Sequence, residues 1–245
     1  MSRHMCMFCG DEIQPDQLTM EHFVPKGLWE KGHRPEGMKT LPAHKDCNHA
    51  FSKDNEYFRD VIVMEEGAER HPEGQRVREG AIGRKFNERF GSVVKTLKNV
   101  GMRRIHTPSG IYVGDRPAFE VDAERVERVL CNVMKGVFYV AQKRPLPKEF
   151  IISVSDVRAL DPEWVTKTVS FMVPWQSFGD SAFCCRYVVS SKKPIEKMTC
   201  LMQFYENRLF LGEAISPKVL GEDGELFVRV RDGASVVVPR WSAER

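Results

Sequence analysis

Two short stretches decide the fold of the first part of this chain: CMFCG at residues 6–10 and HKDC at residues 44–47. Each stretch carries two zinc-binding side chains separated by two residues, a spacing that lets both reach one tetrahedral ion. The glycine at position 10 gives the backbone the freedom that a tight turn needs after the second cysteine. We therefore expect one structural zinc site with four ligands, namely Cys6, Cys9, His44 and Cys47.

The alternative for these residues is a set of buried free cysteines beside an unrelated histidine. Two matched pairs at zinc-binding spacing favour the metal. The other cysteines lie in apolar, strand-like or helix-like contexts, where a reduced thiol packs as a small hydrophobe: Cys131, Cys184, Cys185 and Cys200. Cys184 and Cys185 are adjacent in an expected strand, so their side chains face opposite sides and cannot easily bind one ion together.

Two further motifs accompany these pairs: TMEHFVP at residues 19–25 and CNHAFSKD at residues 47–54. A carboxylate–histidine pair, an apolar residue and a proline, followed later by a Cys-Asn step and a Ser-Lys step, resembles the HNH (ββα-metal) endonuclease family in its zinc-containing form. The likeness covers about residues 5–60, roughly a quarter of the chain. Its motifs are specific jointly, although a Glu-His dipeptide alone is common.

The resemblance implies a one-metal phosphodiester hydrolase. His22 is the general base in this pattern, and it deprotonates water while its imidazole is neutral. Glu21 and Asn48 hold the catalytic ion, and their oxygen ligands suit Mg2+ or Mn2+. Since adjacent strand residues face opposite sides, Glu21 and His22 can share one site only where the strand twists out or bulges before Pro25. The alternative is an exposed Glu-His pair on a surface strand.

This sequence departs from the family pattern at two positions. The family has an asparagine nine residues before the metal-binding Asn48, where it braces the active-site loop, and Lys39 stands there instead. Lysine cannot accept a hydrogen bond, so either Thr40 does the bracing, or Lys39 contacts phosphate, or catalysis is impaired. His44 replaces the commoner third cysteine, which zinc accepts. His49 is a rival metal ligand, but one helical step of about 100° turns it away from the site.

The first part of the chain is expected to contain a zinc knuckle, a strand that ends at Pro25, a loop rich in glycine and proline, a return strand near residues 40–41 and a helix from about Cys47. So small a module buries little apolar surface alone, so metal binding would contribute to its folding. We assign residues 1–70 to this HNH nuclease module with structural zinc and residues 71–245 to a second, α+β domain, with the boundary inside residues 67–80.

Positive charge concentrates after the first module. Residues 70–104 hold ten lysines or arginines against three glutamates, while the whole chain carries a net charge of only +3. A helix over about 81–100 would place an apolar arc on one side and a basic face on the other. That face could contact phosphates, or it could be merely solvated. Its candidate nucleic-acid contacts, taken together with Lys39 and Lys53, are Arg84, Lys85, Arg89, Lys95 and Lys98.

The remaining residues predict one helix followed by strands. Asp122 can cap a helix over about 122–140 whose apolar stripe packs in the core. Short apolar or alternating runs then predict antiparallel strands within about 150–240: 150–154, 169–173, 183–189, 200–205, 209–215, 226–230 and 236–238. Glu206-Asn207 predicts a hairpin, and Asp223-Gly224 and Asp232-Gly233 predict turns. The expected fold class is α+β, with the zinc-stapled ββα-metal module first, amphipathic helices next and an antiparallel β-rich domain last.

The bulk composition is that of an ordinary globular protein, with 42% hydrophobic and 29% charged residues. No apolar run is long enough to cross a membrane, and residues 1–4 do not begin an apolar leader, so we expect a cytoplasmic protein without a membrane partner. The mild net charge permits a nucleic-acid partner without requiring one. The oligomeric state stays open, and a homodimer is one possibility.

Three functions remain from these observations. The leading expectation is an endonuclease acting on DNA, with Zn2+ for structure and Mg2+ or Mn2+ for catalysis; the family resemblance names this substrate. The second is a zinc-stapled module that binds nucleic acid or protein without cutting, which Lys39 motivates. The third is a nuclease of RNA.

Overall fold

The computed structural model describes residues 3–84, 98–107, 109–190, 194–219, 226–229 and 235–238. It is a mixed α+β protein with an antiparallel sheet in its C-terminal half, which confirms the expected class at that level. The helices are α1 (Lys45–Ala50), α2 (Ser52–Met64), α3 (Pro72–Val77), α5 (Ala123–Gln142) and α6 (Pro162–Ser170). Short 3-10 turns and one π-helical turn join them: η1 (Pro15–Gln17), η2 (Lys26–Leu28), η3 (Ala68–Arg70), η4 (Arg78–Ile82), η5 (Val157–Ala159) and η6 (Pro217–Val219).

The strands of the described residues form four sheets. The two-stranded sheets are formed by β1 (Leu18–His22) with β2 (Thr40–His44), β3 (Lys98–His106) with β4 (Tyr112–Glu120), and β10 (Leu226–Arg229) with β11 (Ser235–Val238). The five-stranded antiparallel sheet has the order β5-β9-β8-β7-β6, made of β5 (Ile151–Asp156), β9 (Arg208–Ile215), β8 (Lys197–Phe204), β7 (Phe183–Val189) and β6 (Gln176–Ser177). No helix of the described residues is long and apolar enough to span a membrane.

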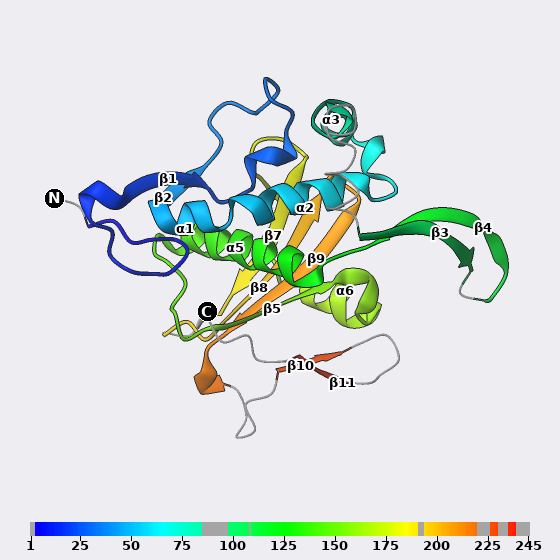
Figure 1. The fold of residues 1–245 in the computed structure, drawn as a ribbon. Coiled ribbons are helices and arrows are strands. Elements are labelled where there is room, and N and C mark those ends of the chain that lie inside the picture. Colours follow the sequence, from blue (N-terminus) through cyan, green and yellow to red (C-terminus); the bar gives the residue numbers. More distant parts are fainter. Residues whose placement is uncertain are drawn as a thin grey trace.

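The N-terminal elements follow the order strand, strand, helix. β1 pairs antiparallel with β2, and α1 starts directly after β2 and packs on both strands. α2 continues from α1 and crosses the molecule toward the base of the β3–β4 hairpin (Figure 1). β1 ends three residues before the predicted end at Pro25, β2 starts at the predicted Thr40 and continues to His44, and α1 begins two residues before the expected start at Cys47.

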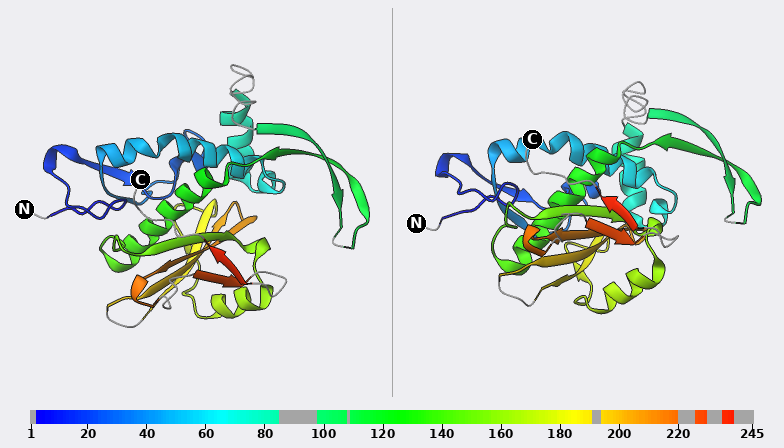
Figure 2. Two further views of the ribbon diagram at one scale, coloured as in Figure 1. Left: turned by 60° about the horizontal axis from the view of Figure 1, so that its bottom comes forward. Right: turned by 90° about the horizontal axis from the view of Figure 1, so that it is seen from below.

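α5 lies between the N-terminal elements and the five-stranded sheet (Figure 2). Asp122 accepts a hydrogen bond from the backbone N–H of Arg125, as a helix cap does, which confirms the predicted helix. A Cβ atom added at Gly136 would lie 2.3 Å from the Cβ of Phe23, so only glycine lets the segment after β1 approach α5 this closely. One continuous apolar cluster extends from Cys6 to Ala214, across the boundary expected near residue 70; the division into two domains stays a prediction.

Two predicted elements differ from the structure. Residues 169–173 do not form a strand: Val169 and Ser170 end α6, which starts after the capping Asp161 and packs Trp164 and Val169 on a small separate cluster. This short run has β propensity, but its first residues are helical because the helix lets its apolar side chains pack into a core. The helix expected over 81–100 is helical at its described start, where η4 ends at Ile82 and residues 83–84 continue as α-helix, but it is wrong at its end, because residues 98–100 begin β3. Residues 85–97 lie outside the described part.

The other strand predictions are confirmed within a few residues, from β5 to β11. The hairpin predicted at Glu206-Asn207 joins β8 to β9. Tyr205 and Glu206 adopt positive φ angles of 49° and 57°, which a tight hairpin loop of this hand requires. The expected turns at 223–224 and 232–233 lie outside the described residues.

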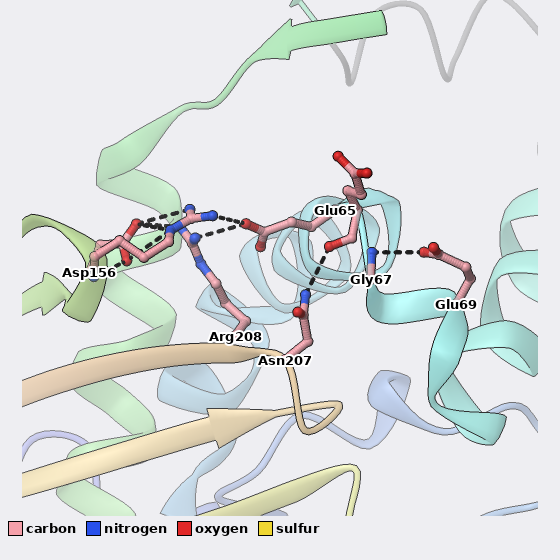
Figure 3. Close-up of polar contacts among 8 residues, drawn as sticks. Glu65, Gly67, Glu69, Asp156, Asn207 and Arg208 are labelled. Atoms are coloured by element: carbon pink, nitrogen blue, oxygen red, sulfur yellow. Dashed lines mark hydrogen bonds and ion pairs between the residues drawn. The ribbon is translucent and has the colours of Figure 1, made fainter. Parts of the chain in front are cut away.

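An ionic network fastens the end of α2 to the sheet (Figure 3). Arg208, at the start of β9, lies 2.7 Å from both Glu65 and Asp156, and its contact with Glu65 is an ion pair without hydrogen-bond geometry. Arg158 approaches the same two carboxylates at 2.9 and 3.0 Å. Asn207 adds a hydrogen bond of 2.9 Å to the backbone carbonyl of Glu66. The network therefore holds the α2 terminus on the edge of the sheet.

Replacing Arg208 by alanine is expected to lower the free energy of unfolding by about 2 kcal/mol. The substitution leaves Glu65 and Asp156 partly buried with Arg158 as their one remaining partner in this network, and uncompensated buried charge is costly. Arg158→Ala is the matched control, because its side chain is 66% exposed against 15% for Arg208, and it should cost below about 1 kcal/mol. Urea denaturation measures both; equal losses would contradict this account.

Candidate metal centre and active site

A turn at residues 6–10 presents the first two cysteines. The backbone N–H of Gly10 donates to the carbonyl of Cys6 at 2.9 Å, and Gly10 adopts a φ of 76° that favours glycine. The N–H of Met7 donates to the carbonyl of Pro42 at 2.9 Å, which attaches this turn to β2. The turn therefore lies beside the end of β2, where His44 precedes α1.

The structure brings the four predicted zinc ligands together. Their ligand atoms all lie within 4.8 Å of one another, although the two pairs are 35 or more residues apart: Cys6, Cys9, His44 and Cys47. The Nδ1 atom of His44 lies 3.4 Å from the Sγ of Cys9 and 4.0 Å from the Sγ of Cys47. A tetrahedral zinc ion holds neighbouring sulfur and nitrogen ligands about 3.5–3.8 Å apart. This Cys3His cluster could hold a zinc ion.

The electrostatics of the cluster also fit a cation. Burial raises the pKa of Cys47 to about 12, and the negative charges of Cys6 and Cys9 add to the effect. Burial also raises the pKa of Cys6, but hydrogen bonds from the backbone of Cys9, His44 and Phe8 outweigh it and lower the pKa overall. Three thiolates cannot share so small a space without a positive charge between them, and a divalent ion supplies that charge.

Lys135 of α5 is a residue near the cluster that the sequence reasoning missed. Its Nζ donates to the backbone carbonyl of Phe8 at 3.0 Å, inside the turn that carries the cysteines. Burial lowers its pKa, while Cys131, Cys9, Cys6 and Cys47 counteract that shift, so the ammonium group lies within the field of the thiols. The available signal was a lysine and a cysteine one turn apart in an otherwise apolar helical stretch.

We expect Lys135→Met to weaken zinc binding about 10-fold, because a site with three thiolates carries net negative charge that Lys135 offsets at close range. Lys148→Met is the matched control. Lys148 forms an exposed ion pair with Asp11 beside the same turn, where solvent screens its charge, so its zinc affinity should stay within about 2-fold of wild type. Competition with a chromogenic zinc chelator measures both affinities. Equal affinities of the two variants would remove Lys135 from this role.

Glu21 and Asn48 meet across the join of β1 and α1. Burial raises the pKa of Glu21, and the charge of Lys26 and the nearby side-chain amide of Asn48 only partly counteract this shift. A carboxylate and an amide, both with oxygen ligands, thus lie in contact one residue from the cluster ligand Cys47. This is the contact that the family resemblance leads one to expect.

His22 is the last residue of β1. Burial lowers its pKa, and the nearby positive charges of Lys26 and Arg34 lower it further, so its imidazole is neutral at pH 7. The β1–β2 register is regular from Leu18 to His22, so the strand has no bulge within this ladder, and it ends at His22, before Pro25. Because β1 ends at His22, the backbone leaves the strand at this residue, and its path there determines where the imidazole lies relative to the Glu21 carboxylate.

Thr40 directly follows Lys39, the position at which the HNH pattern has an asparagine. Thr40 lies directly opposite His22 in the β1–β2 ladder, and directly opposed residues share a face of the sheet. Lys39 precedes β2 and is exposed. Thr40, the residue considered for bracing, thus lies opposite His22, while Lys39, considered as a phosphate contact, is exposed to solvent. His49 is exposed on α1.

Besides Lys39, only some of the predicted basic contacts lie in the described part of the chain. Arg84 forms an ion pair of 2.6 Å with Glu30, and Lys53 is exposed near the start of α2. Lys98 begins β3. The remaining three, Lys85, Arg89 and Lys95, lie outside the described residues. Instead, Lys26 and Arg34, which the sequence reasoning did not select, place positive charge beside His22.

Comparison with known proteins returns no match to a family model, to a curated protein or to a solved structure. A proposed function therefore rests on the residues of the site alone. Within the described residues, the Cys3His cluster is the part of the site whose ligand atoms lie close enough together to hold a metal ion. Beside the cluster lie the Glu21–Asn48 contact and His22, with two cations nearby.

Proposed function

We propose that this chain is an HNH-type, metal-dependent endonuclease that hydrolyses phosphodiester bonds in DNA. The observation that carries the proposal is the contact between Glu21 of β1 and Asn48 of α1, next to His22, on a strand-strand-helix unit that the Cys3His cluster can staple. Local sequence does not bring these groups together; they meet because α1 packs on both strands.

Three side chains, those of Glu21, Asn48 and His22, have separate roles in the proposed reaction. Glu21 presents a carboxylate oxygen and Asn48 an amide oxygen, the ligand types that Mg2+ and Mn2+ prefer. An amide carries N–H donors as well as an oxygen, so Asn48 can lower the pKa of Glu21 through an N–H and still present its oxygen to an ion. A divalent ion, if held by these two oxygens, would supply positive charge to the scissile phosphate and the leaving oxygen. His22 accepts the proton of the attacking water.

Lys26 and Arg34 complete the site by attracting the substrate. Both lie close enough to His22 to disfavour its protonated form, so both project charge to the place where the phosphate would bind. Cations that contact phosphates raise affinity without selecting a sequence. Thr40 lies opposite His22 on the neighbouring strand, and a structural zinc ion held by Cys6, Cys9, His44 and Cys47 would fasten the end of β2 and the start of α1 to the turn at residues 6–10.

A binding module without catalysis is the second candidate. The observations that favour it are the regular β1–β2 ladder at Glu21 and His22 and the exposed lysine at position 39. Such a module would still bind zinc at the Cys3His cluster and would keep the positive charges of Lys26 and Arg34, but it would lack the geometry needed for hydrolysis. It predicts DNA affinity with no cleavage under any divalent ion.

The test is incubation of the purified, zinc-containing protein with supercoiled plasmid, linear DNA and single-stranded RNA, with Mg2+, Mn2+ or no added ion. We expect nicking and linearisation of plasmid with Mg2+ or Mn2+, and none without added ion. Degradation of RNA alone would replace the DNA substrate by RNA. Intact nucleic acid under every ion, together with DNA binding, would establish the non-catalytic module instead.

A further inference from the structure

β3 and β4 form a two-stranded arm, defined here as residues 98–106 and 112–120, that projects from the body of the protein (Figures 1 and 2). Neither outer edge of the arm pairs with another strand of the described chain. Its base is attached beside α2: the backbone N–H of Asp122 donates to the hydroxyl of Tyr57 at 2.7 Å, and Arg116 lies 3.8 Å from Glu66. Every residue from 100 to 106 is exposed.

The arm carries large apolar side chains in solvent. Exposure reaches 65% for Met102, 59% for Val113, 57% for Val100 and 53% for Tyr112. A two-stranded ribbon with both faces in water is marginally stable by itself, and exposed apolar groups of this size usually meet a partner. The arm therefore has the properties of a binding element rather than of a free connection.

Its charge indicates which partner it meets. Arg103 lies directly opposite Arg116 in the ladder, so two like charges share one face of the ribbon, an arrangement that opposes strand pairing. Arg104 lies on the other face, directly opposite Asp115, with which it forms no ion pair. Among the described residues no carboxylate lies within ion-pair distance of Arg103 or Arg104, and Arg116 has one exposed partner, Glu66. Arginines on both faces suit a groove with anionic walls on both sides.

We propose that the β3–β4 arm binds duplex DNA, lying in the major groove with its arginines on the phosphates and its apolar side chains on base edges and sugars. The major groove admits a two-stranded ribbon, and thymine methyl groups give apolar contacts there. A second copy of this chain would cover the apolar residues but would leave the Arg103–Arg116 repulsion uncompensated. The choice of DNA as the nucleic acid rests on the proposed function.

The arm would contact DNA at a distance from the cleavage site. α2 has 13 residues and spans about 20 Å from the end of α1 to the arm base, and a nine-residue strand spans about 30 Å. A base pair rises about 3.4 Å. The arm thus reaches phosphates several base pairs from the scissile one, which lets it hold the duplex without touching the reacting atoms.

The test compares full-length wild type with Arg103→Gln/Arg116→Gln. Fluorescence anisotropy measures binding to a labelled 30-base-pair duplex in a buffer without Mg2+ or Mn2+, at several salt concentrations. We expect at least 10-fold weaker binding at 100 mM salt and a slope of log affinity against log salt that is smaller by about 2, because two phosphate contacts are lost. Lys167→Gln/Lys218→Gln, which removes two exposed charges elsewhere, is the matched control and should bind like wild type.

Thermal denaturation of the same proteins excludes a folding defect. Removing a like-charge pair should leave the melting temperature unchanged or raise it, whereas a structural role of these arginines would lower it and overturn the proposal. Wild-type affinity and slope in the arginine variant would also overturn it. So would light scattering that shows a dimer which Met102→Ser/Val113→Ser converts to monomer without loss of DNA affinity, because the arm would then bind a second copy.

The binding assay separates this inference from the proposed nuclease activity. If wild type never cuts plasmid but the arginine variant loses affinity, the arm proposal stands and the nuclease proposal fails. If wild type cuts and the arginine variant binds as tightly as wild type, the nuclease proposal stands and the arm proposal fails.

Discussion

Cys47→Ser is expected to remove tightly bound zinc and to lower the free energy of unfolding by about 4 kcal/mol. A ligand present at roughly a thousand times its dissociation constant stabilises the folded state by this amount. The effect should be large because the first sixty residues depend on the ligands to hold the turn at residues 6–10, the end of β2 and the start of α1 together. Elemental analysis of the purified variant and urea denaturation measure the two effects.

Cys184→Ser is the control for Cys47→Ser. Cys184 is partly buried in β7, outside the cluster, so its variant should retain one zinc per chain and most of the stability. A chelator that removes zinc from wild type should reproduce the stability of Cys47→Ser. Full zinc content in Cys47→Ser, or no effect of the chelator, would show that the four residues do not form a zinc site.

His22→Ala is expected to reduce plasmid cleavage by about 1,000-fold, because general bases contribute roughly 100- to 10,000-fold to such reactions. Zinc content and melting temperature should stay at the wild-type values, since His22 lies at the end of β1 and is not a ligand of the cluster. Initial rates of nicking with Mg2+ measure the effect. Glu21→Ala should also lose activity, and added Mn2+ should not restore it, because an oxygen ligand is then absent.

His49→Ala is the matched control for His22→Ala. His49 is exposed on α1 and directly follows Asn48, so it tests whether any nearby histidine can serve. We expect its activity within about 2-fold of wild type, well below the loss that general-base removal causes. Equal activity of His22→Ala and wild type would identify a contaminant or another base. Loss of activity in His49→Ala alone would reassign the base to His49.

Sequence patterns predicted the parts of the fold that depend on local chemistry. The spacing of the Cys6 and His44 pairs was sufficient to select four residues whose ligand atoms then lie within 4.8 Å. The period of the apolar stripe and the cap at Asp122 were sufficient for α5. Local patterns failed where a short run was compatible with two structures: residues 169–173 favour a strand by composition, but Val169 packs as the last turn of α6.

The sequence by itself determined the ligand set, the residue types at the candidate active site and most secondary structure, because these depend on spacing and periodicity along the chain. Only the tertiary structure placed Asn48 against Glu21, Lys26 and Arg34 beside His22, and Lys135 behind the cysteine turn. It also revealed Arg103 opposite Arg116 on an exposed arm. Each of these placements depends on strand register or on helix packing between segments that are distant in the sequence. Such contacts produce no periodic pattern along the chain, so sequence periodicity does not predict them.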